Sequence, residues 1–269
     1  MEFASETFTQ VLDKYKYDFN SGDIIAGKIF SHEQKGYLVD IGNQKAGYLP
    51  HAELSINNQD TPENVFNETR EFFILTKNLE SKQLVLSVKR LTYIRAWERI
   101  KQLKKEDISI KVNVQSINKG GLIVTLEDIQ GFIPNSHLGY NYDKTQLLRQ
   151  SIICKLLMAN EHNNKLILSN RCALVEQIMN TTKVGHCMRA QVIDKTTFGV
   201  FFDVYGIPAL LHKSEIHSRY LQNIDYLFAH NSEWSLKIIH LDSKQGRISV
   251  ALNDSDKNFQ AYESLPSSN

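Results

Sequence analysis

Two phenylalanines stand out in the stretch TFGVFFDVYGIPALLHKSEI, residues 197 to 216. A strand alternates its two faces, so burying Val200 and Phe202 turns Phe201 outward, together with Phe198. A ring exposed on a strand offers a flat π-face on which an unpaired nucleobase can stack, for about 1 to 3 kcal/mol per base. The alternative is that a neighbouring helix covers both rings. This strand is therefore a candidate stacking surface.

Three similar segments recur along the chain, and each contains a short strand with alternating buried and exposed positions. Every copy has a glycine, a short alternating strand, a turn, a small residue before two apolar ones, and a polar helix start. The period is about eighty residues, far longer than that of a solenoid, so each copy is predicted to fold around its own core. The copies read KGYLVDIGNQKAGYLPHAEL from Lys35, KGGLIVTLEDIQGFIPNSHL from Lys119 and FGVFFDVYGIPALLHKSEI from Phe198.

Each copy contains five short strand signals, with one longer polar connection between the third and the fourth. This pattern predicts a mainly β protein of three tandem five-stranded OB-fold barrels joined by short helical linkers. Gly36, Gly120 and Gly199 recur beside the same strand. We expect them at a bulge or sharp bend that a side chain would obstruct, with ordinary turn glycines as the alternative.

The domain boundaries follow from these strands and from amphipathic connectors such as LTYIRAWERIKQLKKED. In this connector Ile94, Trp97, Ile100 and Leu103 share one side of a helix, which we expect to be packed. The polar composition after Asn253 favours disorder. The expected parts are an N-terminal helix (1–20), the first barrel (21–90), a linker (91–105), the second barrel (106–170), a linker (171–183), the third barrel (184–253) and a disordered tail (254–269).

Composition restricts the possible functions. Hydrophobic residues make up 42% of the chain, and no apolar run approaches the roughly 20 residues of a membrane span, so no membrane partner is expected. The first residues have early acids and no Arg, unlike a signal or transit peptide. Cys154, Cys172 and Cys187 form no C-x-x-C pair, so neither a disulfide framework nor a cysteine-based zinc site is expected. We expect no metal, cofactor or small-molecule substrate.

The net charge is +1, but the charge is unevenly distributed. Residues 91 to 170 contain 11 Lys and Arg against 7 Asp and Glu, whereas residues 1 to 90 contain 10 against 13. The middle segment is therefore the one best suited to a polyanion. His212 and other histidines near the C-terminal end can add positive potential beside such a partner.

The third copy is similar to the S-one RNA-binding domain, a five-stranded OB barrel. In that family an aromatic-Gly-small-Phe-Val-Asp strand precedes G-L-L-H-x-S-E, and the domain closes near Asp and Arg. Ala209 and Ala251 depart from the usual Gly and Ser. The matching positions are Phe198, Gly199, Phe201, Asp203, Leu210, Leu211, His212, Ser214, Glu215, Asp242 and Arg247.

The resemblance implies an RNA-binding face on which His212, Asp242 and Arg247 lie beside Phe198 and Phe201. Arg247 can bind a phosphate or stack through its guanidinium plane, and His212 can donate a hydrogen bond without a permanent charge. Considered alone, His212 is better explained as a local hydrogen-bonding residue, and its placement together with the rings and Arg247 is what favours RNA binding.

The other two copies lack this set. At the ring and His positions the first copy has Lys35, Leu38 and Pro50, and the second has Lys119, Leu122 and Pro134. Their stacking capacity is therefore expected to be lower. In the second copy we expect Lys119, Lys155 and Lys165 to hold the phosphate backbone.

Over residues 8 to 253 the chain resembles the small-subunit ribosomal protein S-one family, in the short three-domain form of cyanobacteria and plastids. The strings LDKYKYDFNSGDI, NETREFFIL, YIRAWERI, KGGL and GFIPNSHL carry this match. The resemblance implies a non-catalytic component of the small ribosomal subunit that binds single-stranded mRNA with weak sequence preference and supports translation initiation. Its partners would be mRNA, rRNA and small-subunit proteins, and the acidic first copy would dock onto the ribosome.

Two other functions stay open. A free RNA chaperone would use the same barrels. An RNA-processing enzyme would need a separate catalytic region, for which the repeats and connectors leave no room. For localisation, the resemblance and the Asn-, Ile- and Lys-rich composition indicate a ribosome in the plastid stroma, with a cyanobacterial cytoplasm as the alternative.

Overall fold

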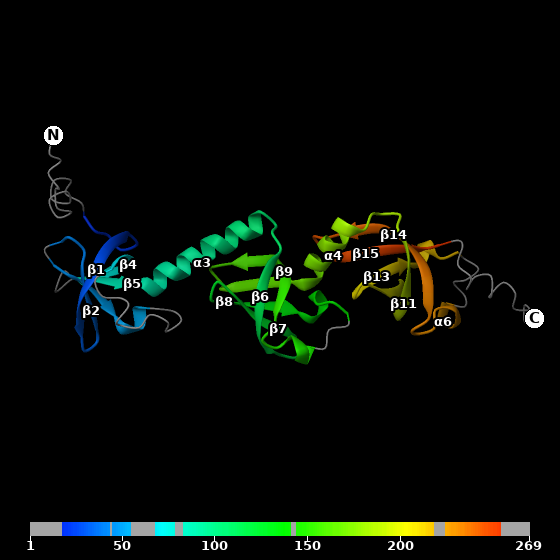
Figure 1. Cartoon of the computed structure of the whole chain (residues 1–269), viewed down its shortest axis with the longest axis horizontal. Helices are drawn as coiled ribbons and strands as arrows, with labels where there is room; N and C mark the ends of the chain where they lie inside the picture. Colours follow the sequence, from blue (N-terminus) through cyan, green and yellow to red (C-terminus); the bar gives the residue numbers. More distant parts are fainter. Residues whose placement is uncertain are drawn as a thin grey trace, which may run out of the picture. The chain divides into compact units, whose positions relative to one another are not determined.

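The computed structural model describes residues 18–43, 45–54, 68–78, 83–140, 144–217 and 224–253. These residues form three closed five-stranded barrels, and helices α3 (Val88–Lys105) and α4 (Asn170–Thr181) follow the first and the second barrel along the chain (Figure 1). The expected tail at 254–269 lies outside the described residues. So does the expected N-terminal helix at 1–20, apart from residues 18–20, which are not helical.

The strands are short, as the sequence predicts. The first barrel contains β1 (Ile24–Glu33), β2 (Gly36–Asp40), β3 (Gly47–Pro50), β4 (Thr69–Lys77) and β5 (Leu84–Ser87). The second contains β6 (Ile110–Ile117), β7 (Gly121–Leu126), β8 (Ile129–Pro134), β9 (Ser151–Asn160) and β10 (Lys165–Ser169). The third contains β11 (Cys187–Thr196), β12 (Gly199–Val204), β13 (Ile207–His212), β14 (Glu233–Asp242) and β15 (Arg247–Leu252). Short helical turns are η1 (His51–Glu53), η2 (Asn135–His137), η3 (Lys144–Leu147), η4 (Lys213–Glu215) and α6 (Ile224–Leu227).

All three barrels share one strand order. The first strand pairs antiparallel with the second and the fourth, and a parallel contact between the third and the fifth closes the barrel. That contact is one residue pair in each of the first two barrels, Tyr48 with Val85 and Phe132 with Ile167. In the third barrel it extends over three consecutive pairs. The predicted fold of three tandem OB-type barrels is confirmed.

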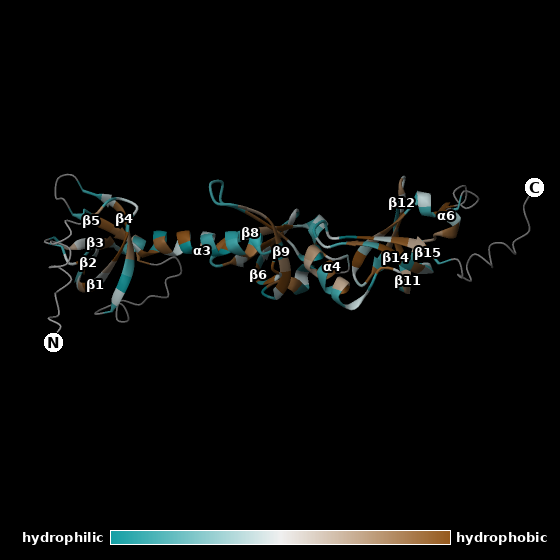
Figure 2. Cartoon of the chain, turned by 90° about the horizontal axis from the view of Figure 1, so that it is seen from above, coloured by the Kyte–Doolittle hydropathy of each residue, from teal (hydrophilic) through white to brown (hydrophobic). Residues whose placement is uncertain are grey.

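Strand alternation builds each core. In β12, Val200, Phe202 and Val204 are fully buried, whereas Phe201 between them is half-buried. The rings of Phe202 and Phe228 form an edge-to-face pair, with centroids 6.1 Å apart. Fully burying such a side chain stabilises the fold by about 1.5–3 kcal/mol. Figure 2 shows the resulting hydrophobic bands on the strands, and the mixture of hydrophilic and hydrophobic positions along α3.

A glycine begins the second strand of every barrel for a steric reason. A Cβ added to Gly36, Gly121 or Gly199 would collide with a carbonyl oxygen of the neighbouring third strand. These glycines are not bulges, because the register shifts lie in the preceding strands, such as Ile29–Ser31, but the expected obstruction of a side chain is confirmed at Gly36 and Gly199. In the second copy the glycine that cannot accept a side chain is Gly121. A Cβ added to Gly120, the expected position, would make only ordinary contacts.

One compact unit ends at Ile100, and a second begins at Lys101 and contains the second barrel, α4 and the third barrel. Within this second unit α4 contacts β9 on one side and β13, β14 and β15 on the other. The backbone N–H of Tyr140 also donates to the carbonyl of Gly206, at 2.7 Å. The second and third barrels are therefore packed together through α4 rather than independent modules.

Helix α3 has the expected apolar side, since Trp97 and Ile100 are fully buried and Ile94 and Leu103 are half-buried. Among the described helices, none combines the length and the hydropathy that a membrane crossing requires.

Candidate nucleic-acid interface

A groove of about 450 Å³ lies on the outer face of the third barrel. Strand β13 runs between β12 and β15, and the pairing aligns Phe201 with Leu210 and Leu210 with Ser249. These outward residues form a row across three strands, and Phe198 lies just before β12. The groove is lined by Arg171, Phe198, Phe201, Pro208, Leu210, Gly246, Arg247, Ile248 and Ser249.

The two expected rings meet in this groove. Phe198 is 45% exposed and Phe201 is half-buried. Their centroids are 6.0 Å apart and their planes are nearly perpendicular, at 89°. This edge-to-face arrangement fixes the rings against one another. Phe198 thus keeps a ring partly open to solvent, as a stacking surface requires.

His212 lies at the end of β13, opposite Gly199, which follows Phe198 along the chain, and it is not part of the groove lining. Its Nδ1 accepts a hydrogen bond from the backbone N–H of Ser214, at 3.2 Å, and lies 2.8 Å from the hydroxyl of the same residue. Because Nδ1 is an acceptor here, a neutral His212 carries its proton on Nε2. The side chain both caps η4 and retains one donor for a ligand.

Asp242 and Arg247 face one another as the last pair of the β14–β15 hairpin. One oxygen of Asp242 accepts the backbone N–H groups of Lys244 and Gln245, at 2.9 and 3.0 Å, and so shapes the turn. Arg247 is exposed and lines the groove. Asp242 therefore shapes the turn that leads to Arg247, and its side chain is not part of the groove lining.

The second barrel presents different residues from those expected. In the third barrel the backbone N–H of Lys213 donates to the carbonyl of Phe198, at 3.0 Å. The equivalent hydrogen bond in the second barrel runs from the N–H of Asn135 to the carbonyl of Gly120, at 2.9 Å, so Gly120 corresponds to Phe198. The ring positions of the second copy are therefore Gly120 and Ile123. Lys119 and Leu122 do not hold them, and Leu122 is fully buried in the core.

Sequence reasoning missed one aromatic residue on each of the first two barrels. Phe132 lines a groove of about 290 Å³ on the second barrel together with Ile123 and Lys165. Tyr48 lines one of about 830 Å³ on the first barrel together with Lys35. Both aromatics occupy the third-strand position that Leu210 has in the third barrel. The outward alternation of the third strand was the signal that could have identified them.

The three lysines expected to hold phosphate have different environments. Lys119 and Lys165 are exposed, and only Lys165 lines the groove of the second barrel. Lys155 is 3% exposed, and its Nζ lies 2.8 Å from Asp107 Oδ2 and 2.7 Å from Glu176 Oε1. The expectation for Lys155 is corrected by this geometry, because a buried and doubly paired ammonium cannot meet an RNA backbone.

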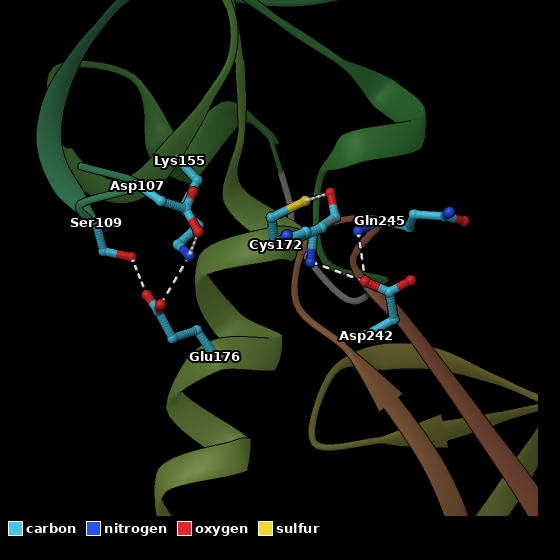
Figure 3. Close-up of polar contacts among 8 residues, drawn as sticks. Asp107, Ser109, Lys155, Cys172, Glu176, Asp242 and Gln245 are labelled. Atoms are coloured by element: carbon cyan, nitrogen blue, oxygen red, sulfur yellow. Dashed lines mark hydrogen bonds and ion pairs between the residues drawn. The ribbon is translucent and has the colours of Figure 1, made fainter. Parts of the chain in front are cut away.

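The buried network around Lys155 sets the charge of its members. Burial lowers the pKa of Lys155, but hydrogen bonds to Asp107 and Glu176 outweigh it and the net pKa is raised. Burial likewise raises the pKa of Glu176, yet the hydrogen bonds from Lys155 and Ser109 bring it below its ordinary value. Both ions therefore keep their charges at neutral pH. Figure 3 shows this cluster between α4 and the strands of the second barrel.

The cysteines lie apart from the groove lining. Cys154 and Cys172 are buried, Cys187 is exposed, and all three are free thiols. Burial raises the pKa of Cys154 to about 12. Within the part of the chain that the structure describes, no cluster of three or more His, Cys, Asp and Glu is arranged to hold a metal ion.

Comparison with known proteins agrees with the three-barrel architecture. The family model described as the S1 RNA binding domain matches residues 18–89, 103–171 and 181–253. The chain belongs to the S1 RNA binding domain family. The match covers each barrel separately, so all three are S1 domains.

Curated relatives match nearly the whole chain. It is 46% identical to the small ribosomal subunit protein bS1c of Pyropia yezoensis, over 93% of this chain and 96% of the relative. It is 44% identical to bS1A of Synechocystis sp., over 93% of this chain and 76% of the relative. It is 41% identical to bS1 of Synechococcus sp., over 93% and 82%. The similarity therefore extends across all three S1 domains and both linker helices.

Proposed function

We propose that this protein is a non-catalytic component of the small ribosomal subunit that holds single-stranded mRNA and supports translation initiation. The observation that carries the proposal is the groove of the third S1 domain, which combines an open aromatic ring with Arg247. Stacking accepts any base, because every base has a π-face, so the sequence preference is weak. The names of the small-subunit relatives support the ribosomal setting.

The three S1 domains divide the work. The third binds RNA through Phe198, Phe201, Arg247 and the free donor of His212. The second contributes Lys119 and Lys165 on the basic middle segment, with Phe132 as an added stacking residue. Tethered modules of modest affinity hold a strand together by effective concentration, while each one can still release it.

The first domain, with the segment before it, docks onto ribosomal protein. Its excess of acidic residues makes it the least suited of the three to an RNA backbone. Deleting residues 1 to 90 is expected to abolish co-sedimentation with the small subunit. Undiminished association would remove the docking proposal. A full-length protein that stays at the top of the gradient would instead support a free RNA chaperone. The cyanobacterial and red algal relatives support a plastid or a cyanobacterial cytoplasm as its location.

The RNA-binding face is tested by replacing both rings, Phe198→Ala with Phe201→Ala, in the full chain. Each stacked base that is lost costs about 1–3 kcal/mol, which weakens binding of a single-stranded oligonucleotide about 5- to 150-fold. Tyr226→Ala is the control, since Tyr226 is 72% exposed on the same domain and lies outside the groove. Equal titration curves for the double variant and the control would refute the assignment.

A further inference from the structure

The linker helix α4 places an arginine in the groove of the third S1 domain. Arg171 is the second residue of α4, which starts where the Ser169 side chain accepts the backbone N–H of Cys172, at 3.1 Å. It lines the same groove as Phe198 and Arg247. The sequence alone places this residue in a linker and gives it no role in binding.

The β14–β15 turn packs directly on the first turn of α4. The thiol of Cys172 lies 3.4 Å from the carbonyl oxygen of Lys244 and donates to it (Figure 3). Gly246 has a φ of +63°, and a Cβ there would lie 3.1 Å from the backbone nitrogen of Cys172 and 3.2 Å from Nε of Arg171. Only a glycine allows this close approach without a shift. The approach holds Arg171 beside the residue that follows Gly246, which is Arg247.

Arg171 and Arg247 form a pair of like charges. The Nε of Arg171 is buried and has no hydrogen-bond partner, and within the described residues neither guanidinium makes an ion pair with a carboxylate. Burial lowers the pKa of Arg171, and the positive charge of Arg247 lowers it further against the opposing effect of Cys172. His137 experiences the same field, because burial and then Arg171 lower its pKa. Such a cluster is stabilised by a bound anion.

We propose that Arg171 and Arg247 together bind one phosphate of the single-stranded RNA whose bases stack on Phe198 and Phe201. This inference rests on the proposed RNA-binding function of the third domain. Guanidinium groups match phosphate through paired N–H donors, and two of them offset its charge while their mutual repulsion is relieved. The RNA site of the third domain then includes a residue from outside the barrel.

The position of Arg171 depends on the second domain as well. Glu176 lies on the same helix as Arg171, five residues before the helix ends at Thr181, and is bound by the buried Lys155 of β9 and by Ser109. These contacts fix α4 on the second barrel, while the turn of the third barrel packs on its start. RNA bound at the arginine pair therefore holds the second and third domains in one arrangement.

The test uses the full chain and a fluorescent single-stranded oligonucleotide of about six nucleotides, near the lower range for one OB fold. Arg171→Gln is expected to raise its Kd about tenfold and to reduce the slope of log K against log salt by up to about 0.7. Arg171→Lys keeps the charge and is expected to retain that slope. Arg189→Gln is the control, because the Arg189 side chain is 70% exposed on the same barrel and lies outside the groove.

Combining Arg171→Gln with Arg247→Gln is expected to weaken binding little more than either change alone, since both side chains act on one phosphate. The thermal midpoint of Arg171→Gln should not fall, because the substitution removes a repulsion. If Arg171→Gln matches the control in affinity and slope while loss of the two rings weakens binding, this inference is overturned and the proposed function stands. If loss of the rings has no effect either, both are overturned.

Discussion

The buried lysine at position 155 gives the sharpest test of how α4 is held. Lys155→Met keeps the length of the stem and removes the ammonium that bridges Asp107 and Glu176. Removing one partner of a fully buried pair costs about 3–5 kcal/mol. Here the side chains of Asp107 and Glu176 are 55% and 35% exposed. Water can compensate both carboxylates in part, so we expect about 1–3 kcal/mol.

The assay is a double-mutant cycle of Lys155→Met and Glu176→Gln in the full chain. A chain of three barrels does not unfold in one two-state step, so a single thermal midpoint does not report on α4. The free energy of local opening is therefore measured by hydrogen exchange of peptides from α4 and β9. We expect a coupling free energy of about 1–2 kcal/mol for opening these peptides. If the free-energy changes of the two single variants sum to that of the double variant within about 0.3 kcal/mol, Lys155 and Glu176 do not act as a pair. The proposal that this pair holds α4 on the second barrel would then be wrong.

Three further results are expected. Glu176 has a lowered pKa, so its contribution to stability is present above pH 4.5 and is lost as the pH falls through the folded value; Glu176→Gln should reduce the acid-induced loss of the free energy of opening α4, measured by hydrogen exchange. Gly121→Ala should lower the free energy of opening of the second barrel by about 1–3 kcal/mol, measured by hydrogen exchange of peptides from β7 and β8. Gly120→Ala should be tolerated, and equal effects of the two substitutions would contradict the steric explanation. Mass spectrometry after brief alkylation at neutral pH should find label on Cys187 alone, since Cys154 and Cys172 are buried; rapid labelling of either would show that their barrel surroundings open.

Much of the fold follows from local sequence signals. The alternation around Phe201 predicts which side chains enter the core, and that prediction is confirmed. The spacing of the three copies predicts three separate barrels. The placement of the second copy was wrong by one residue, because KGG contains two adjacent glycines and the sequence does not tell which of them faces a carbonyl. The backbone pairing of Gly121 with Pro134 resolves this.

The parts of the site that sequence did not predict depend on contacts between distant segments. Lys155 looked like a phosphate ligand because its partners, Asp107 and Glu176, are 48 and 21 residues away along the chain. Arg171 looked like a linker residue because its neighbour Arg247 belongs to the next barrel. Charge alone does not distinguish a buried ammonium from an exposed one. Burial and partner geometry supply that distinction.

The parallel pairing between the third and fifth strands, which closes each barrel, differs in length among the three barrels, and we expect the stiffness of the barrel wall to differ with it. In each of the first two barrels the third and fifth strands are paired at a single position, Tyr48 with Val85 and Phe132 with Ile167. The aromatic residue of each groove belongs to that pair. In the third barrel the two strands are paired at three consecutive positions, and Leu210, which lines the groove, is the middle residue of the three. With more backbone pairs along this line, the third barrel is expected to lose less conformational freedom when RNA binds. Opening between the third and fifth strands is accordingly expected more in the first two barrels than in the third.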